Sequence, residues 1–169
     1  SEYGCGSVCY QIPLLEVQQK IMDNIPNKLW VIFFRRAMIE LGCKIAKIEG
    51  GSALITGENI GQVASQTLSN IRAAEDASDL PIIRPLAGSN KEDIVRRAQQ
   101  IGTYQISIEP YQDCCSYFVP DHPETKADLI LVKMISEKVD INVEMENALK
   151  KMKKNEFLQN KETGEWQLN

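Results

Sequence analysis

The alternation of apolar and polar positions predicts short strands and helices that follow one another along the chain. An apolar run at 53–55 precedes a break at 56–59, and apolar residues then recur at helical spacing from Ile60 to Ile71. We therefore expect a buried strand that leads through a tight glycine turn into a helix. In open α/β sheets, ligands bind at the carboxyl ends of the strands, and a helix N-terminus there offers N–H groups to an anion. The same pattern also fits an ordinary, solvated strand–helix junction.

The remaining chain shows the same two periodicities. They predict further strands and helices, namely strands at 7–12 and 80–83 and helices at 14–22, 28–48 and 142–157. Ser89 begins a capping box with Glu92, and Gly102 ends the helix that it opens. Thr125 can cap another helix, with Asp128 at its third position.

The order of these elements is typical of a parallel α/β fold. We expect a parallel sheet with flanking helices, in which the strands at 7–12 and 53–55 both take part, and two C-terminal helices appended on one side. The predicted division places the sheet domain at 1–123, the helices at 124–160 and a loosely held tail at 161–169.

Composition and charge narrow the classes of protein that the chain can represent. Its 169 residues are 43% hydrophobic and 25% charged, as in globular domains, and no apolar run approaches the length of a membrane span. The net charge of -4 argues against a free-standing nucleic-acid binder, because phosphate contacts need a basic surface. The cysteine count of five is odd, and with no secretory signal this indicates reduced thiols and a cytoplasmic protein. Because no apolar run is long enough for a membrane span, we expect no membrane contact.

Two adjacent arginines and one glutamate are the first candidates for chemistry. Arg35 and Arg36 interrupt the apolar face of the helix at 28–48, and a buried guanidinium needs a partner. We expect one of them to meet a carboxylate, a helix end or a ligand phosphate, although a snorkelling arginine fits the pattern equally well. Glu58 can cap the following helix or meet a metal, and capping is the commoner outcome.

The paired cysteines Cys114 and Cys115 lie among prolines and aromatic residues in an irregular stretch. A reachable, partly ionised cysteine can act as a nucleophile or carry a persulfide, whereas a buried pair would only fill space. His122 is the only histidine, which leaves a serine hydrolase or a zinc hydrolase little support.

Three long motifs carry a family resemblance. The stretches ALITGENIGQVASQTLSNI, IIRPLAGSNKEDIVRRAQQIGTYQISI and PYQDCCSYFVPDHPETKA occur in that order, with FFRRAMI in register before them. Together they resemble the tRNA 4-thiouridine synthetase (tRNA sulfurtransferase, ThiI) family. The resemblance implies a PP-loop ATP pyrophosphatase fold, which is Rossmann-like. It also implies an enzyme that uses ATP and Mg²⁺ to adenylate a uridine at position eight of tRNA, before a persulfide sulfur replaces O4.

Carried over residue by residue, the resemblance assigns roles to particular side chains. The ATP contacts of the family fall on Arg35, Gly57 and Gln66, and the catalytic cysteine falls on Cys114, with Cys115 as second choice. We expect support for the nucleotide site from three further polar side chains, Glu58, Gln62 and Arg84. No metal ligand is expected among these residues.

The chain also departs from the family pattern. It has no SGGxDS-type PP-loop, and no THUMP or rhodanese region. We therefore expect a fragment that lacks the first strand of the sheet, is inactive alone and leaves an apolar edge between the strands at 7–12 and 53–55. The partners implied are tRNA, a cysteine desulfurase as sulfur donor and a second copy in a homodimer, with a further role in thiamine synthesis. The alternatives are a non-catalytic nucleotide-binding or assembly module and an adenylating sulfurtransferase with a different substrate.

Overall fold

The computed structural model describes residues 7–110, 122–159 and 166–168. The chain divides into two compact units, of which one comprises Ser1–Lys20 with Ile141–Asn169 and the other Ile21–Asp140. Helix α1 (Leu15–Asn24) begins in the first unit and ends in the second. The domain boundaries expected at 123 and 160 remain predictions.

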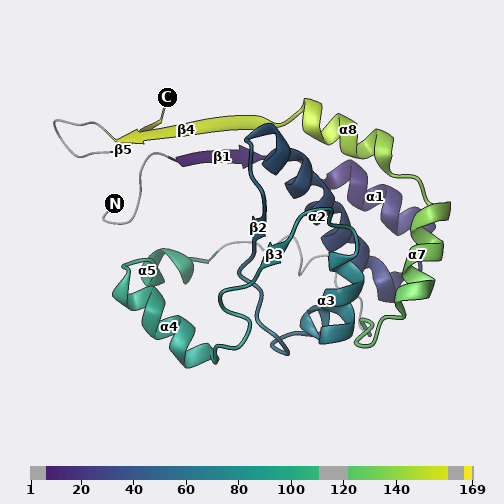
Figure 1. The fold of residues 1–169 in the computed structure, drawn as a ribbon, viewed down its shortest axis with the longest axis horizontal. Helices are drawn as coiled ribbons and strands as arrows, with labels where there is room; N and C mark the ends of the chain where they lie inside the picture. Colours follow the sequence, from purple (N-terminus) through teal and green to yellow (C-terminus); the bar gives the residue numbers. More distant parts are fainter. Residues whose placement is uncertain (1–6, 111–121, 160–165, 169) are drawn as a thin grey trace. The chain divides into compact units, whose positions relative to one another are not determined.

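The larger unit is built on one long helix and a short parallel pair of strands (Figure 1). A short 3-10 turn, η1 (Asn27–Leu29), leads into α2 (Trp30–Ile48), which confirms the long helix that the periodicity predicts. Strands β2 (Leu54–Ile55) and β3 (Ile82–Ile83) pair in parallel, as expected. Successive side chains of β2 point to opposite faces of the strand pair: Leu54 packs against the core, whereas Ile55 is 73% exposed.

The core of this unit lies between α2, α3 (Leu68–Glu75) and the inner side of the strand pair. Ile39 and Cys43 from α2 meet Ala74 from α3, and Leu54, Leu80 and Ile82 pack against them. These contacts hold the carboxyl ends of β2 and β3 beside α2, which positions the loop that follows β2.

The buried Arg36 shows how a charged side chain is accommodated on the apolar face of α2. Its side chain is 8% exposed, and Nη1 donates a hydrogen bond to the carbonyl oxygen of Ala73 at 2.5 Å. The carboxylate of Asp76 lies 3.5 Å from the same atom. The guanidinium therefore meets both the C-terminal end of α3 and a carboxylate, which confirms that a buried arginine here needs a partner.

Acid is expected to weaken this arrangement through Asp76. Partial burial acts to raise the pKa of Asp76, but Lys133, whose Nζ lies 2.8 Å away, and Arg36 outweigh it and hold the pKa below its ordinary value of 3.8. A lowered carboxyl pKa stabilises the fold above the ordinary value, and the effect is lost as pH falls through the native pKa. Denaturant titrations should show a stability gap between the parent and Asp76→Asn that is constant near neutral pH and closes below about pH 4. A stability gap that stays unchanged down to pH 2 would contradict this expectation. In a protein that already carries Lys133→Met, the loss of stability caused by Asp76→Asn should be smaller.

The helix expected from Ile60 to Ile71 is wrong in its first half. The chain makes a short 3-10 turn, η2 (Ala64–Gln66), and α3 starts only at Leu68 with Thr67 as its N-cap. Two features prevent an earlier start: Gly61 has a φ of +81°, and Asn59 Nδ2 donates to the carbonyl oxygens of Leu86, at 2.9 Å, and Ser89. Gly57 therefore precedes an extended loop and not a helix N-terminus.

Two predicted capping residues are also wrong. Helix α4 (Lys91–Gln100) is capped by Asn90 instead of Ser89, and α7 (Leu129–Lys138) by Asp128 instead of Thr125. In each case the side-chain oxygen that reaches the first-turn amides decides the cap. Helix α5 (Tyr104–Ser107) follows α4, after Gly102 ends that helix with a φ of +71°.

The smaller unit corrects the expected sheet. Strand β1 (Ser7–Gln11) pairs antiparallel with β4 (Lys153–Gln159), which in turn pairs with β5 (Trp166–Leu168) (Figure 1). Thus β1 does not join the parallel pair, and the expectation that the strands at 7–12 and 53–55 belong to one sheet is wrong. The last helix, α8 (Asn142–Lys150), ends before the predicted 157, because the following residues pair with β1. Pairing across the chain overrides a local helical pattern.

In the described part of the chain, we find no helix with the length and apolar character that a membrane crossing requires.

Candidate functional site

A cavity of about 720 Å³ opens between α2, the end of β2 and the loop that follows it. Its volume lies in the range of small-molecule sites. Apolar side chains from α2, β2 and the following loop form much of its lining, namely Val31, Ile32, Met38, Ile39, Leu54, Ile55 and Val63. Polar groups converge from the other sides, namely Lys28, Arg35, Thr56, Glu58, Ser65, Gln66, Asn70 and Glu124. An apolar hollow with a few convergent polar groups suits a small organic ligand that carries polar substituents.

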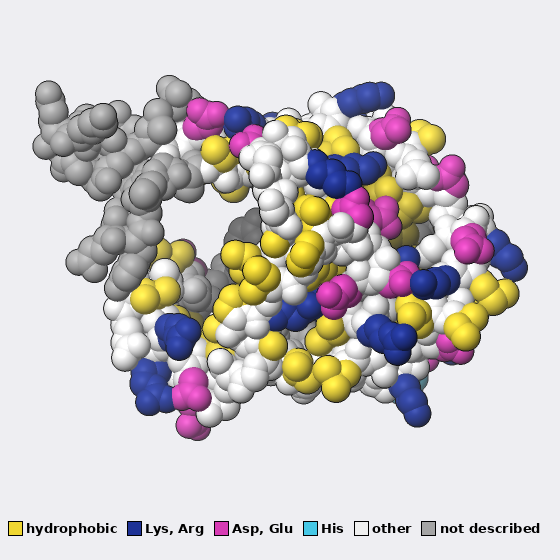
Figure 2. All heavy atoms as spheres, in the orientation of Figure 1, with side chains coloured by type: hydrophobic (Ala, Val, Ile, Leu, Met, Phe, Trp, Pro, Cys, Tyr) yellow, Lys and Arg dark blue, Asp and Glu magenta, His cyan; other side chains and the backbone are white. Residues whose placement is uncertain are grey.

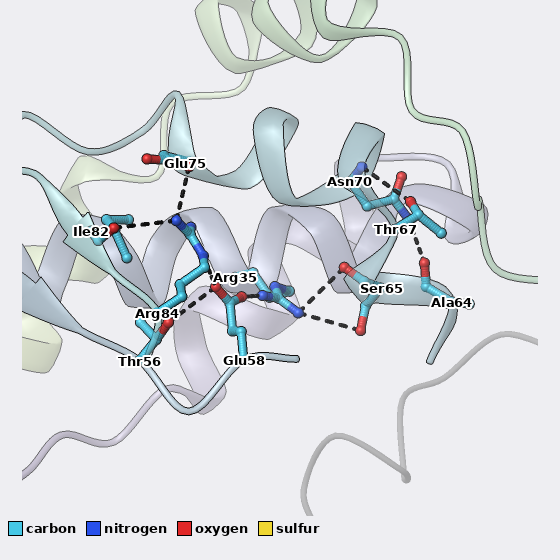
Figure 3. Close-up of polar contacts among 10 residues, drawn as sticks. All are labelled: Arg35, Thr56, Glu58, Ala64, Ser65, Thr67, Asn70, Glu75, Ile82 and Arg84. Atoms are coloured by element: carbon cyan, nitrogen blue, oxygen red, sulfur yellow. Dashed lines mark hydrogen bonds and ion pairs between the residues drawn. The ribbon is translucent and has the colours of Figure 1, made fainter. Parts of the chain in front are cut away.

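A carboxylate held between two arginines forms the charged wall of the cavity (Figure 3). Glu58 pairs with Arg35 through one oxygen, and its other oxygen lies 2.6 Å from Arg84 Nε. Thr56 Oγ1 donates to the same second oxygen at 3.1 Å. The three charged side chains are only 12–14% exposed, so the carboxylate sits where an uncompensated charge would be costly.

The two arginines are placed by different elements and have different surroundings. Arg35 comes from α2, lines the cavity and lies 3.4 Å from both the carbonyl oxygen and the hydroxyl of Ser65. Arg84 follows β3 and lies behind the wall, where its Nη1 is 3.1 Å from Glu75 Oε2. A guanidinium has five N–H donors, so Arg35 can meet Glu58 on one edge and an anion on another.

Gln66 has a buried atom that a ligand could satisfy, whereas Gly57 shows no feature in the described part of the chain that requires glycine. The Oε1 atom of Gln66 is buried and has no hydrogen-bond partner in the structure. Such an acceptor is costly unless a ligand or water satisfies it, and an amino group on a ring is a suitable donor. At Gly57 a Cβ atom would meet nothing within 4 Å, and the φ is not positive, so no contact within the described protein requires glycine there.

The structure therefore brings together only some of the predicted residues. Arg35, Glu58 and Gln66 line the cavity, and Arg84 holds Glu58 from behind. Gly57 and Gln62 are exposed and do not contribute to the lining. Cys114 and Cys115 lie outside the described residues.

Sequence reasoning missed the far end of the cavity. Asn70 on α3 and Pro123 and Glu124 before α7 line it there, although they are more than 50 residues apart in the chain. The one local signal is the Thr67–Asn70 spacing, which is that of an N-cap and the third residue of a helix.

A comparison with protein-family models shows to which family the chain belongs. The model described as thiamine biosynthesis protein (ThiI) matches residues 1–141. The chain belongs to the ThiI family. This confirms the resemblance that the three sequence motifs indicate.

Relatives in the ThiI family are named for one activity. A protein of Caldanaerobacter subterraneus subsp. tengcongensis described as a probable tRNA sulfurtransferase is 44% identical over 147 residues, which is 87% of this chain and 39% of the relative. A protein of Thermus thermophilus with the same description is 48% identical over 121 residues, which is 72% of this chain and 30% of that relative. The chain thus spans well under half the length of these curated relatives.

A solved structure supports the fold. The crystal structure of a 4-thiouridine synthetase–RNA complex with bound ATP matches with a TM-score of 0.84 and 40% sequence identity. The match covers 90% of this chain and 40% of the other. The α/β class predicted from the order of elements is therefore confirmed.

Charge and metal ligands complete the description. Basic and acidic side chains intermingle on the face shown in Figure 2, without a broad patch of one sign. Within residues 7–110, 122–159 and 166–168, no three histidine, cysteine, aspartate or glutamate side chains group as a metal site would require.

Proposed function

We propose that these residues form the nucleotide-binding part of an ATP-dependent tRNA sulfurtransferase. The protein would adenylate the uridine at position eight of tRNA and replace its O4 with persulfide sulfur to make 4-thiouridine. A cysteine desulfurase would supply the sulfur, in the cytoplasm, and a homodimer and a role in thiamine synthesis belong to the same proposal. The observation that carries the proposal is the cavity in which Arg35 and the unpartnered Gln66 Oε1 lie together beside an apolar wall.

The residues of this cavity suit ATP by their chemistry. The apolar wall from α2 and β2 would receive the purine ring and keep water from it, while Gln66 Oε1 would accept a hydrogen bond from its amino group. Arg35, already neutralised in part by Glu58, would hold negative charge on the ligand.

The reaction needs activation at the uridine oxygen. When bound, ATP would supply an AMP group to O4 with release of pyrophosphate, so that attacking sulfur could displace AMP instead of a poor oxygen leaving group. The role of the described residues is to bind and orient the nucleotide. Mg²⁺ would accompany the ATP phosphates, as the family resemblance implies.

Direct binding of ATP to the full-length protein tests the site. Arg35→Lys keeps the positive charge but loses the fork of donors, so we expect about tenfold weaker binding by calorimetry. Gln66→Leu should weaken binding severalfold through loss of one acceptor. Arg97→Lys, on the exposed surface of α4, is the matched control and should bind ATP like the parent.

Two results would count against the proposal. If the parent does not bind ATP, or if Arg35→Lys and Arg97→Lys bind it equally well, the cavity is not the nucleotide site. ATP binding with 4-thiouridine retained in the tRNA of a deletion strain would favour the alternative of a non-catalytic nucleotide-binding or assembly module, or a sulfurtransferase with another substrate.

A further inference from the structure

The buried Asn70 joins two segments that are distant in the chain. It is 1% exposed, and its Nδ2 donates to the carbonyl oxygens of Ala64, at 2.7 Å, and Glu124, at 2.6 Å. Its Oδ1 accepts a hydrogen bond from the amide of Ala127 at 3.0 Å. Both donors and the acceptor of this side chain are therefore used on backbone groups, and two of the three bonds reach the segment 124–127.

A second side chain and the short turn η1 hold the same segment. Thr67 Oγ1 donates to the carbonyl oxygen of Thr125 at 2.7 Å and accepts from the amide of Asn70 at 3.2 Å (Figure 3 shows the Thr67–Asn70 pair). The amide of Glu124 donates to the carbonyl oxygen of Lys28 at 3.0 Å, and the two side chains form an ion pair at 3.7 Å. The segment is thus fixed from α3 on one side and from η1 on the other.

These anchors lie at the wall of the cavity. Ala64, Asn70, Pro123 and Glu124 all line it, and Ala64 is two residues from Gln66. Loss of the Asn70 side chain would release the carbonyl oxygen of Ala64 and that of Glu124 together. Both the turn that carries Gln66 and the 123–127 wall would then lose a fixed position.

We infer that Asn70 is a positioning residue that holds the 123–127 segment and the Ala64–Gln66 turn together in the wall of the nucleotide cavity, with Thr67 as the second anchor. The inference rests on the proposed function, because the ligand whose site is shaped is ATP. Asn70 acts through these backbone groups and needs no contact with the nucleotide.

Binding and amide exchange on the full-length protein test the inference. Asn70→Ala should weaken ATP binding on the order of tenfold and speed hydrogen exchange at the amide of Ala127. Thr67→Val should act in the same direction, and Thr67→Ser, which keeps the hydroxyl, should restore affinity. Leu41→Ala removes a side chain that is 2% exposed on α2 outside the cavity lining, so it should lose stability but keep ATP affinity.

The outcomes separate the inference from the proposed function. If the parent binds ATP and Asn70→Ala binds it as tightly as Leu41→Ala, the positioning role is wrong and the proposed function stands. If Thr67→Val and Thr67→Ser bind ATP with equal affinity, Thr67 is not a second anchor. If the parent does not bind ATP, both the proposed function and the inference are overturned.

Discussion

Glu58→Gln is expected to lower the free energy of unfolding by about 3 kcal/mol and to weaken ATP binding in the same protein. The substitution keeps the shape of the side chain but removes the negative charge between Arg35 and Arg84. Two guanidinium groups, each at most 14% exposed, would then lose the carboxylate that lies between them, and Arg84 would keep its ion pair with Glu75. Arg35 would move away from the cavity wall, and the nucleotide would lose its oriented cation.

A double-mutant cycle distinguishes charge repulsion from simple loss of packing. Adding Arg84→Met to Glu58→Gln removes the surplus cation, so we expect about 1 kcal/mol of stability to return. Chemical denaturation gives the stabilities, and calorimetry gives the ATP affinities. Additive effects of the two substitutions would contradict the charge argument.

The exposed pair between Lys47 and Asp79 provides the matched control. Both side chains are 54% exposed, and Asp79→Asn removes the carboxylate charge as Glu58→Gln does. Solvent screens such a pair, so little change in stability and none in ATP affinity are expected. A loss comparable with that of Glu58→Gln would show that burial is not what makes the Glu58 wall important.

The elements that sequence reasoning could predict are those with a strong local period. Helix α2 has an apolar stripe over five turns, and the pair β2 and β3 follows from two short apolar runs in a strand–helix order. Arg36 could be recognised as a residue in need of a partner, because its cost of burial is known from the side chain alone. Its actual partners, Ala73 and Asp76, required the packing of α3.

What could not be predicted depends on contacts between distant segments. The late start of α3 follows from Asn59 bonding to residues 86 and 89, and β4 becomes a strand because β1, more than 140 residues earlier, offers it an edge. The same holds for the site. The motifs and the family resemblance predict Arg35 and Gln66, whereas long-range hydrogen bonds bring Asn70 and Glu124 to the cavity. Local periodicity carries no information on such pairs.

The largest effect on the proposed reaction is expected from Cys114→Ser, which should abolish 4-thiouridine formation and leave ATP-dependent adenylation intact. A serine hydroxyl is far less acidic than a thiol and cannot exchange with a persulfide or a disulfide. Cys114 and Cys115 lie outside the described residues, so this prediction rests on the sequence motif and the family resemblance. Mass spectrometry of tRNA measures thiolation, and ATP–pyrophosphate exchange measures adenylation.

Two controls make the cysteine prediction decisive. Cys9→Ser changes an exposed free thiol on β1 and should leave both steps unchanged. Cys115→Ser decides between the adjacent thiols. Loss of thiolation in Cys115→Ser but not in Cys114→Ser would assign the catalytic role to Cys115. Unimpaired thiolation in both variants would refute a catalytic role for either cysteine. Because Glu58→Gln should weaken ATP binding and Cys114→Ser should not, the two variants fail at different steps. Exchange and thiolation measured side by side therefore separate the nucleotide cavity from the sulfur chemistry.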